Sequence, residues 1–385
     1  MELTKCKLGE LITQRREKND GSDLPICGVS KDGLIPPKQK DADTSIYNVF
    51  YRDDFIFNPA RMELNSIAIN DMYDRAICSS LYEVFYVHRT DLLLPHYLKL
   101  IVRQKWFARY CEFLGQGSAR EYCRFGNISE IEIEFPPIEE QQKIVDYNTA
   151  IENRIALKQK INDNLDERMK ALFKSWFIDF EPFNNSLVLT EGGNYIPENW
   201  IETTLGEYVT YAQGTQVPVE EQYFELDENR VRFLRIVDYT GNTSDEPRYI
   251  EVKSKNSTCC PEDILIIRYG ASAGQICRGL SGVFANNLFS ITPTKLISNS
   301  YLYYLLTQPT VQSFITSVGE TSSAMPALTH GLISSIPIVI PQSAKYLNNF
   351  AQIADEVFKQ QLLNNEEIDV LMSLSKNLLA NLSSR

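Results

Sequence analysis

Two acidic residues and a lysine in the second half of the chain are of the types that a magnesium-dependent nuclease uses. The carboxylates of Asp238 and Glu251 could hold the metal ion, and Lys253 could lie beside an attacking water molecule. The pattern is short and common, and it occurs in one half of the chain only. We therefore favour the alternative interpretation, in which these residues are surface charges on a hairpin.

Two further patterns are similar to motifs of amino-methyltransferases. Phe57-Asn58-Pro59-Ala60 resembles the Asn-Pro-Pro-aromatic motif but lacks the second proline and the aromatic residue. Phe113-Leu-Gly115-Gln-Gly117 resembles the cofactor-binding glycines, but it follows residues 97–111, which we expect to be helical where the motif needs a strand. The sequence contains no Gly-Lys dipeptide, so it has no phosphate-binding G-x-x-x-x-G-K-[ST] loop. We expect no catalytic residues in this chain.

The cysteines and histidines do not have the spacing of a metal site. The eight cysteines include no C-x-x-C pair, and the three histidines are far apart. We expect reduced, mostly buried thiols and no bound metal. No apolar run approaches the length of about 18 residues that a membrane span needs, and the first residues have no signal-peptide stretch. These features predict a soluble cytoplasmic protein.

The net charge of −12 at first argues against a nucleic-acid partner, because phosphate neutralisation normally needs a basic surface. The average hides an asymmetry. Residues 1–127 carry 18 basic and 17 acidic side chains, whereas the rest of the chain carries a net charge of −13. The basic residues of the first segment are therefore either a solvated face or part of a binding surface.

The chain repeats itself with a period near 200 residues. The segment at residues 7–12 recurs at 204–209, with Leu-Gly-Glu in both copies, and Tyr97-Leu98 recurs as Tyr301-Leu302. The stretch that ends in Pro136 matches the one that ends in Pro341. A period of this length indicates two copies of a globular domain plus a connector, in a chain whose 385 residues suffice for two or three domains.

Each copy has the same predicted order of elements. A strand-rich part comes first, then a single helix at roughly 95–113 or 299–317, then a short extended stretch that ends in proline. One long helix follows, at about 138–178 and 344–382, with no glycine or proline inside. About forty residues at 1.5 Å each make a rod of roughly 60 Å.

A lone amphipathic helix of that length needs a partner for its apolar stripe, and we expect the two long helices to pair antiparallel as a coiled coil. The alternative is that each helix packs only on its own domain. The polar residues Lys158, Asn162 and Asn364 would help to fix the register of the pair. The apolar residues expected in the interface are Ile144, Ile151, Ile155, Leu165, Met169, Leu172, Ile353, Val357, Ile368, Leu371 and Leu378.

Several segments resemble the specificity (S) subunits of type I restriction-modification enzymes, also called the HsdS family. The most specific are residues 135–145, with Glu139-Glu140-Gln141, then residues 160–165, 170–182 and 196–206. Phe57-Asn-Pro-Ala-Arg61 and Asn65-Ser-Ile67 resemble a segment common in the target recognition domains of these proteins. The second copy departs from the pattern at residues 341–345, which lack the Glu-Glu-Gln signature.

The resemblance implies an α+β fold, a tandem duplication of two mixed α/β target recognition domains separated by two long antiparallel coiled-coil helices. We expect recognition domains at 1–136 and 183–340 and helices at 137–182 and 341–385. Each domain would read one half of a bipartite sequence in double-stranded DNA. Two DNA-methyltransferase subunits would dock on the helices, and restriction and translocase subunits would join them. S-adenosylmethionine, ATP and Mg²⁺ would then belong to those partners, with no cofactor in this chain.

The residues expected to contact DNA are basic or hydroxyl-bearing side chains from both copies. Two glycine-rich loops, at 115–120 and 319–326, are equivalent by the repeat and resemble a DNA-facing loop of the family, although as plain connecting loops they need no function. The candidates are Arg15, Arg16, Lys31, Arg61, Ser118, Arg120, Arg124, Thr215, Gln216, Arg232, Arg235, Arg268, Arg278, Ser322 and Ser323. The competing hypothesis is a stand-alone nuclease or methyltransferase with a duplicated fold.

Overall fold

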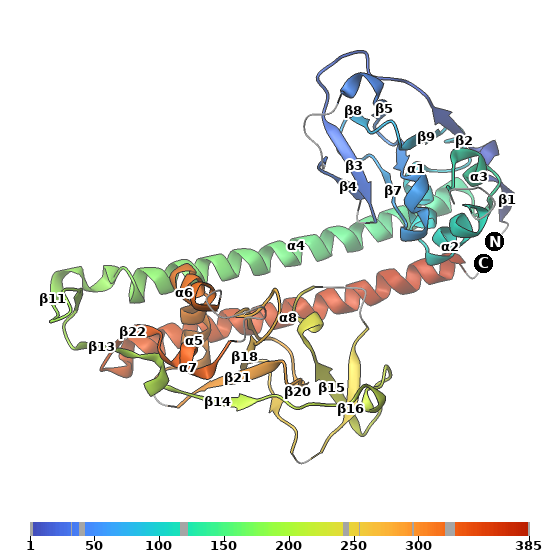
Figure 1. The fold of residues 1–385 in the computed structure, drawn as a ribbon. Coiled ribbons are helices and arrows are strands. Elements are labelled where there is room, and N and C mark those ends of the chain that lie inside the picture. The colour runs from blue at the N-terminus through green and yellow to red at the C-terminus, as the bar shows by residue number, and fades with distance from the viewer. Residues whose placement is uncertain are drawn as a thin grey trace. The chain divides into compact units, whose positions relative to one another are not determined.

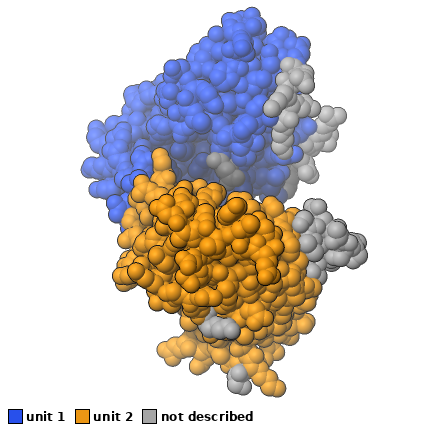
Figure 2. All heavy atoms as spheres, turned by 90° about the vertical axis from the view of Figure 1, so that its left-hand side faces the viewer, with its two compact units in different colours: residues 1–157, 367–385 blue, residues 158–366 orange. Residues whose placement is uncertain are grey.

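The computed structural model describes residues 3–31, 33–37, 43–115, 122–241, 246–253, 255–294, 296–319 and 328–383. The chain divides into two compact units (Figure 2), one made of residues 1–157 and 367–385 and the other of residues 158–366. Each unit contains one globular domain and a section of both long helices. We call the two globular parts the first domain and the second domain.

The described residues of the first domain form ten strands and three short α-helices. They form one two-stranded and two four-stranded sheets, with the strand orders β1-β10, β2-β9-β6-β7 and β4-β3-β8-β5. All pairs are antiparallel except β3 and β8. The strands are β1 (Thr4–Lys7), β2 (Ile12–Arg15), β3 (Ile26–Ser30), β4 (Gly33–Ile35), β5 (Asn48–Tyr51), β6 (Phe55–Phe57), β7 (Ile67–Ile69), β8 (Arg75–Cys78), β9 (Glu83–Val87) and β10 (Glu132–Phe135).

The second domain repeats this topology strand for strand. Its sheets have the orders β13-β22, β14-β21-β18-β19 and β16-β15-β20-β17, and its one parallel pair, β15 and β20, matches β3 and β8. A separate hairpin, β11 (Leu187–Leu189) with β12 (Tyr195–Pro197), precedes it. The other strands are β13 (Trp200–Thr204), β14 (Val209–Gln213), β15 (Arg230–Leu234), β16 (Arg248–Glu251), β17 (Thr258–Cys259), β18 (Ile264–Ile267), β19 (Ile276–Cys277), β20 (Gly282–Phe284), β21 (Leu288–Pro293) and β22 (Pro337–Pro341).

The repeated Leu-Gly-Glu segment has the same structural role in both domains. Leu8 and Leu205 are buried, and their N–H groups donate to the carbonyls of Ile131 and Ile336 at 2.9 Å. A Cβ atom added to Gly206 would lie 2.9 Å from the Cβ of Ser334, and the equivalent contact of Gly9 is at 3.0 Å. Glycine recurs here because the backbone passes too close to a neighbouring helix end for a side chain.

The single helix predicted in each copy is wrong, because the structure divides it into two. In the second domain Pro309 opens a new helix, since proline cannot continue the preceding one. In the first domain the break lies at Gln104, whose side chain is buried and accepts a hydrogen bond of 2.6 Å from the indole of Trp106. The short helices are α1 (Pro95–Val102), α2 (Lys105–Gly115), α3 (Phe125–Ser129), α5 (Asn299–Leu306), α6 (Pro309–Gly319) and α7 (His330–Ser334).

The two long helices are α4 (Ile138–Phe177) and α8 (Ala344–Ser383). Their bounds agree to within one residue with 138–178 and 344–382, which the periodicity predicts, and lie inside the wider ranges 137–182 and 341–385. They run alongside each other in opposite directions (Figure 1). In the first unit Arg154 pairs with Glu367 at 2.7 Å, and Ser375 bonds to Asn148. In the second unit Lys158 bonds to Asn364, and further along α4 Phe173 packs against Phe350, which is earlier in α8. The expected antiparallel pairing is confirmed, and the alternative of two separate helices is wrong.

Ten of the eleven apolar side chains expected in the helix interface are buried or half-buried. They are Ile144, Ile151, Ile155, Leu165, Met169, Leu172, Val357, Ile368, Leu371 and Leu378. Ile353 contradicts the expectation, because it is 43% exposed. Its neighbours Phe350 and Ala354 take the buried positions of that stretch, and adjacent helical residues lie about 100° apart around the axis.

A polar layer interrupts this seam within the second unit. The side chain of Asn364 is 1% exposed; it accepts hydrogen bonds from Lys158 at 2.9 Å and Gln360 at 3.1 Å, and it donates to Asn162 at 2.7 Å. Asn162 in turn donates to Asn365 at 2.9 Å. Shifting either helix along the other would take the buried side chain of Asn364 away from these partners. The three residues predicted to fix the register are thus joined to one another, and their effect on the register stays a prediction.

Both long helices also belong to the cores of the domains beside them. In the second unit Phe173 of α4 packs 5.1 Å from Tyr301 of α5 and 5.5 Å from Phe350 of α8, measured between ring centroids. In the first unit Gln141 of α4 is fully buried; its amide donates to the carbonyls of Leu92 and Pro136 and accepts from the N–H of Leu94. Each helix section is therefore fixed to its domain by buried contacts.

In the described part of the chain, no helix is both long and apolar enough to cross a membrane.

Candidate nucleic-acid interface

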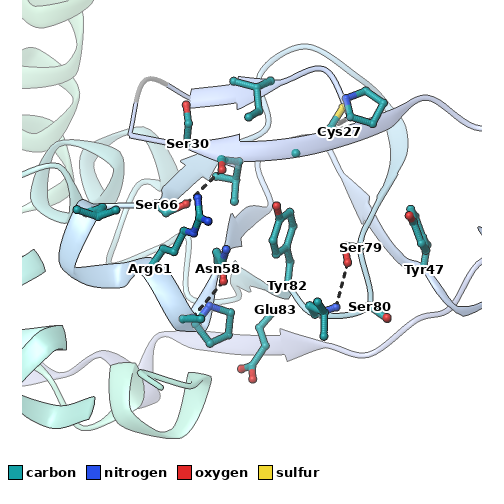
Figure 3. Close-up of a pocket in the computed structure, with 18 of the residues that line it drawn as sticks. Cys27, Ser30, Tyr47, Asn58, Arg61, Ser66, Ser79, Ser80, Tyr82 and Glu83 are labelled. Carbon is teal, nitrogen blue, oxygen red and sulfur yellow. Dashed lines mark hydrogen bonds between the residues drawn. The ribbon is translucent and has the colours of Figure 1, made fainter. Parts of the chain in front are cut away.

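A pocket of about 1100 Å³ lies in the first domain (Figure 3). Four segments line it: the β3–β4 hairpin, the β6–β7 connection, the β8–β9 turn and the strand-like residues that lead into α3. Three of the predicted DNA-binding residues, Lys31, Arg61 and Arg124, come from different segments and meet at this pocket. The structure thus brings together side chains that are up to 93 positions apart in the sequence.

The β6–β7 connection contains the segment that resembles a common part of target recognition domains. Asn58 caps its short 3-10 helix, Pro59–Leu64, because its side-chain oxygen accepts the N–H of Ala60 at 3.1 Å. Pro59 takes the first helical position, and Asn65 ends the turn with a φ of 56°. Ser66 then donates to the carbonyl of Val29 at 3.2 Å. The turn that carries Arg61 is therefore held at both ends.

The cations of the pocket outnumber the acids. Arg61 and Lys31 are exposed, and within the described residues neither makes an ion pair or a side-chain hydrogen bond. Arg124, whose side chain is 63% exposed, pairs with Glu83 at 3.2 Å. Glu83 also accepts the N–H of Phe125 at 2.8 Å, so its charge serves to position the start of α3. The rim carries positive charge that phosphate groups can neutralise.

The other two basic candidates of the first domain that the structure describes, Arg15 and Arg16, lie in different surroundings. The guanidinium of Arg15 makes two hydrogen bonds to the buried carboxylate of Asp54, at 2.6 and 3.1 Å, and packs over the rings of Tyr51 and Tyr86. Burial raises the pKa of Asp54, which the hydrogen bond from Arg15 opposes. Arg16 is exposed and donates to Gln14 at 2.8 Å.

Thr215 and Gln216 line a smaller pocket of the second domain, of about 350 Å³. The hydroxyl of Thr215 accepts the N–H of Ser257 at 2.9 Å. The preceding residue must be glycine, because a Cβ atom on Gly214 would lie 2.0 Å from the carbonyl oxygen of Ala285. The pocket also contains Glu221 and Lys253, which pair with each other.

The four arginine candidates of the second domain do not form one cluster. Arg232 and Arg235 both bond to the carboxylate of Asp238, whose side chain is only 3% exposed. Arg278 packs 3.5 Å from the ring centre of Tyr303 and 4.0 Å from that of Phe358, so its guanidinium lies between the domain and α8. These three side chains have structural partners already.

Arg268 occupies the position in the second domain that Pro59 has in the first. The N–H of Leu328 donates to the carbonyl of Arg268 at 3.1 Å, and the N–H of Cys123 donates to that of Pro59 at 3.0 Å. The side chain of Arg268 donates to Gln213 at 3.2 Å and lies over the ring of Tyr269. Its charge and the burial of the imidazole lower the pKa of His330, with burial the larger cause.

Four predicted residues lie outside the described part of the chain, namely Ser118, Arg120, Ser322 and Ser323. The segments that follow their two loops are described from residues 122 and 328 onward. Cys123 and Leu328 lie at or near their starts, and both are hydrogen-bonded to the strand connections just discussed.

The residues of the competing catalytic hypotheses are engaged in other contacts. Asp238 binds two arginines, and Lys253 binds Glu221. No group of three or more His, Cys, Asp or Glu side chains that could hold a metal ion occurs among the described residues. Phe113 and Gly115 belong to helix α2, where the methyltransferase motif requires a strand.

Sequence reasoning missed the contributions of Gln141 and Gln213. Gln141 belongs to the Glu139-Glu140-Gln141 motif, but two of its three backbone contacts are to Leu92 and Leu94, which are remote in sequence. Gln213 holds Arg268, and its own amide donates to the carbonyl of Asn286 at 2.6 Å. No local pattern marks either residue.

Comparisons with known proteins agree with this architecture. Residues 7–167 match a family model described as the type I restriction modification DNA specificity domain. The MjaIX specificity subunit of Methanocaldococcus jannaschii is 27% identical over 302 residues, which cover 76% of this chain and 69% of that protein. The HindI specificity subunit of Haemophilus influenzae is 21% identical over 357 residues, covering 76% and 77%.

A solved structure has the same fold. It is that of the S subunit of a type I restriction-modification system from M. genitalium, which superposes with a TM-score of 0.62 at 16% sequence identity. The match covers 99% of this chain and 96% of that one.

Proposed function

We propose a function from the premise that this chain belongs to the DNA specificity subunits of type I restriction-modification systems, and that each of its domains reads one half of a bipartite DNA target. One observation carries the proposal. The two domains share a strand order in all three sheets, and in both the same strand connection presents an arginine beside the segment that follows the glycine-rich loop. Two domains that recognise DNA in the same way require such equivalent surfaces.

The paired helices give the second part of the proposal. Their buried polar layer fixes one register, and an exposed apolar set on α4 and α8 includes Tyr147, Val370 and Leu374 within the first unit. We infer that two DNA-methyltransferase subunits dock on the helices and that restriction and translocase subunits join them. These partners would supply the binding sites for S-adenosylmethionine, ATP and Mg²⁺, and they would share the neutralisation of DNA phosphates with this acidic chain.

The chain itself has no catalytic role in this proposal. Of the three residues that the nuclease hypothesis needs, Asp238 and Lys253 are bound to other side chains of the protein. No observation favours the stand-alone enzyme.

Exchange of one domain tests the proposal. Residues 1–127 are replaced by the corresponding segment of another specificity subunit, and the complex with the methyltransferase subunits is expressed in a host without other methylation. Sequencing of the methylated sites should show one half-site changed and the other unchanged, because each domain carries its own surface. A change of both half-sites together, or methylation without a bipartite target, would contradict the proposal. The unaltered chain, expressed alongside, serves as the control.

A further inference from the structure

The strand connections that follow β6 and β18 are the most firmly held parts of the two candidate surfaces. In the first domain the Asn58 cap, the hydrogen bond from Cys123 to Pro59 and the bond from Ser66 to Val29 fix the turn around Arg61. In the second domain the backbone of Arg268 is bonded on both sides, its N–H to Asn287 and its carbonyl to Leu328. The backbone of an arginine on such a turn is fixed, so its side chain reaches a ligand from a defined position.

Arg61 is free to bind. Its side chain is exposed and extends from the turn into the pocket (Figure 3), and no described residue pairs with its guanidinium. The neighbouring Arg124 differs, because Glu83 binds it. Arg61 can therefore present its fork of donors to a ligand without first breaking an ion pair.

Arg268 is positioned rather than free. Gln213 accepts one of its N–H groups, and the amide of Gln213 is itself anchored on the Asn286 carbonyl. The Tyr269 ring lies 5.0 Å from the guanidinium carbon. One neutral acceptor and one ring orient the side chain, and no carboxylate of the described residues pairs with it, whereas Arg232 and Arg235 are neutralised by Asp238.

An arginine on a fixed turn, with no carboxylate partner among the described residues, can present its guanidinium fork to a nucleic acid. The fork matches the O6 and N7 acceptors of guanine in the major groove, which is the commonest specific contact to a base. The same fork can bind a phosphate, a contact that carries no sequence information, so the test below separates the two.

We propose that Arg61 and Arg268 are the specificity-determining residues that each read a guanine, one in either half of the target. This inference rests on the proposed function. It assigns a base contact to each of the two equivalent strand connections. Lys31 and Arg124 are assigned contacts with phosphates.

The test uses the complex of the full chain with its methyltransferase subunits and a set of DNA duplexes that carry each base at every target position. Arg61→Ala should lower the preference for guanine at one position of one half-site by roughly 5- to 150-fold, the range of one bidentate base contact, and leave the other half-site unchanged. Arg61→Gln should move the preference at that position toward adenine, whose N6 and N7 glutamine binds. Arg268→Ala and Arg268→Gln should do the same in the other half-site.

A matched control is Arg52→Ala, because Arg52 is an arginine of the first domain whose half-exposed side chain pairs with Asp74 outside the pocket. It should leave every base preference unchanged. Thermal unfolding of each complex shows that the variants are folded.

Three results would overturn the inference. One is an unaltered preference in Arg61→Ala and Arg268→Ala; another is a uniform loss of methylation on all duplexes, which indicates a phosphate contact; the third is a changed preference in Arg52→Ala. Failure of the unaltered complex to select any bipartite site would instead contradict the proposed function.

Discussion

Lys158 of α4 donates a hydrogen bond of 2.9 Å to the side-chain oxygen of Asn364, an α8 residue that is 1% exposed. The bond belongs to the network that also joins Asn162 and Gln360 to Asn364. A buried polar layer of this kind contributes less to stability than to the choice of one helix register, because every other register leaves its groups unpaired.

Replacing the hub of this layer should destabilise the second unit. Asn364→Ala removes one partner from the half-buried Lys158 and Asn162 and from the exposed Gln360. A hydrogen bond contributes about 0.5–1.5 kcal/mol net and more when one group is charged, so the loss should be about 1–3 kcal/mol. We expect the free energy of unfolding, measured with urea, to fall by that amount. Asn349→Ala changes an exposed asparagine of the same helix and should have little effect. Equal stability of the two variants would show that the layer is not required.

A charge in the apolar seam should be more damaging. Met169 is 3% exposed, so Met169→Asp places an unpaired carboxylate in the interior and should lower the free energy of unfolding by about 3–5 kcal/mol. Leu165→Asp should cost less, because Leu165 is only half-buried. Arg168→Asp introduces the same carboxylate at an exposed position of α4. If all three variants unfold at the same urea concentration, the seam does not hold the helices together.

The repeated glycine offers a test of close backbone approach. Gly206→Ala adds a Cβ atom 2.9 Å from Ser334, which forces the neighbouring helix end to move and should cost about 1–3 kcal/mol. Gly9→Ala, with its contact at 3.0 Å to Ser129, should behave in the same way in the first domain. Gly126→Ala is the control, since no atom lies within 4 Å of its added Cβ. Urea unfolding of the three variants measures these differences in the free energy of unfolding. A Gly206→Ala variant as stable as the unaltered protein would contradict the packing explanation of the repeat.

Lengthening a helix should alter the spacing of the target. Four residues inserted after Asp163 add slightly more than one helical turn, about 6 Å, and nearly preserve the facing stripe. Duplex DNA rises about 3.4 Å per base pair, so we expect the unspecified spacer between the half-sites to change by about one to two base pairs.

Sequencing of methylated DNA checks this expectation. The shift will be smaller if α8, which keeps its length, resists. Methylation at the original spacing with undiminished efficiency would show that the helices do not set the distance. Altered bases within a half-site would show that they do more than hold the readers apart.

The sequence alone determined the duplication and the two long helices. Both depend on periodicity, which is written along the chain: the repeated Leu-Gly-Glu and Tyr-Leu pairs give the period of about 200 residues, and apolar residues at helical spacing without Gly or Pro predict α4 and α8 to within one residue. It also identified Lys158, Asn162 and Asn364, because a polar residue in an apolar stripe is visible as an interruption.

The tertiary structure decided which of the arginines predicted to bind DNA pair with a carboxylate that is remote in sequence. From the sequence Arg15 and Arg61 are alike, but the carboxylate of Asp54, 39 positions along the chain, binds Arg15, and only packing brings that carboxylate to it. The exposure of Ile353 could not be predicted from the sequence either. Its neighbours Phe350 and Ala354 fill the seam at that level of the helix, which leaves Ile353 exposed. Contacts between residues distant in the chain leave no local pattern, since they depend on how the sheets and helices pack.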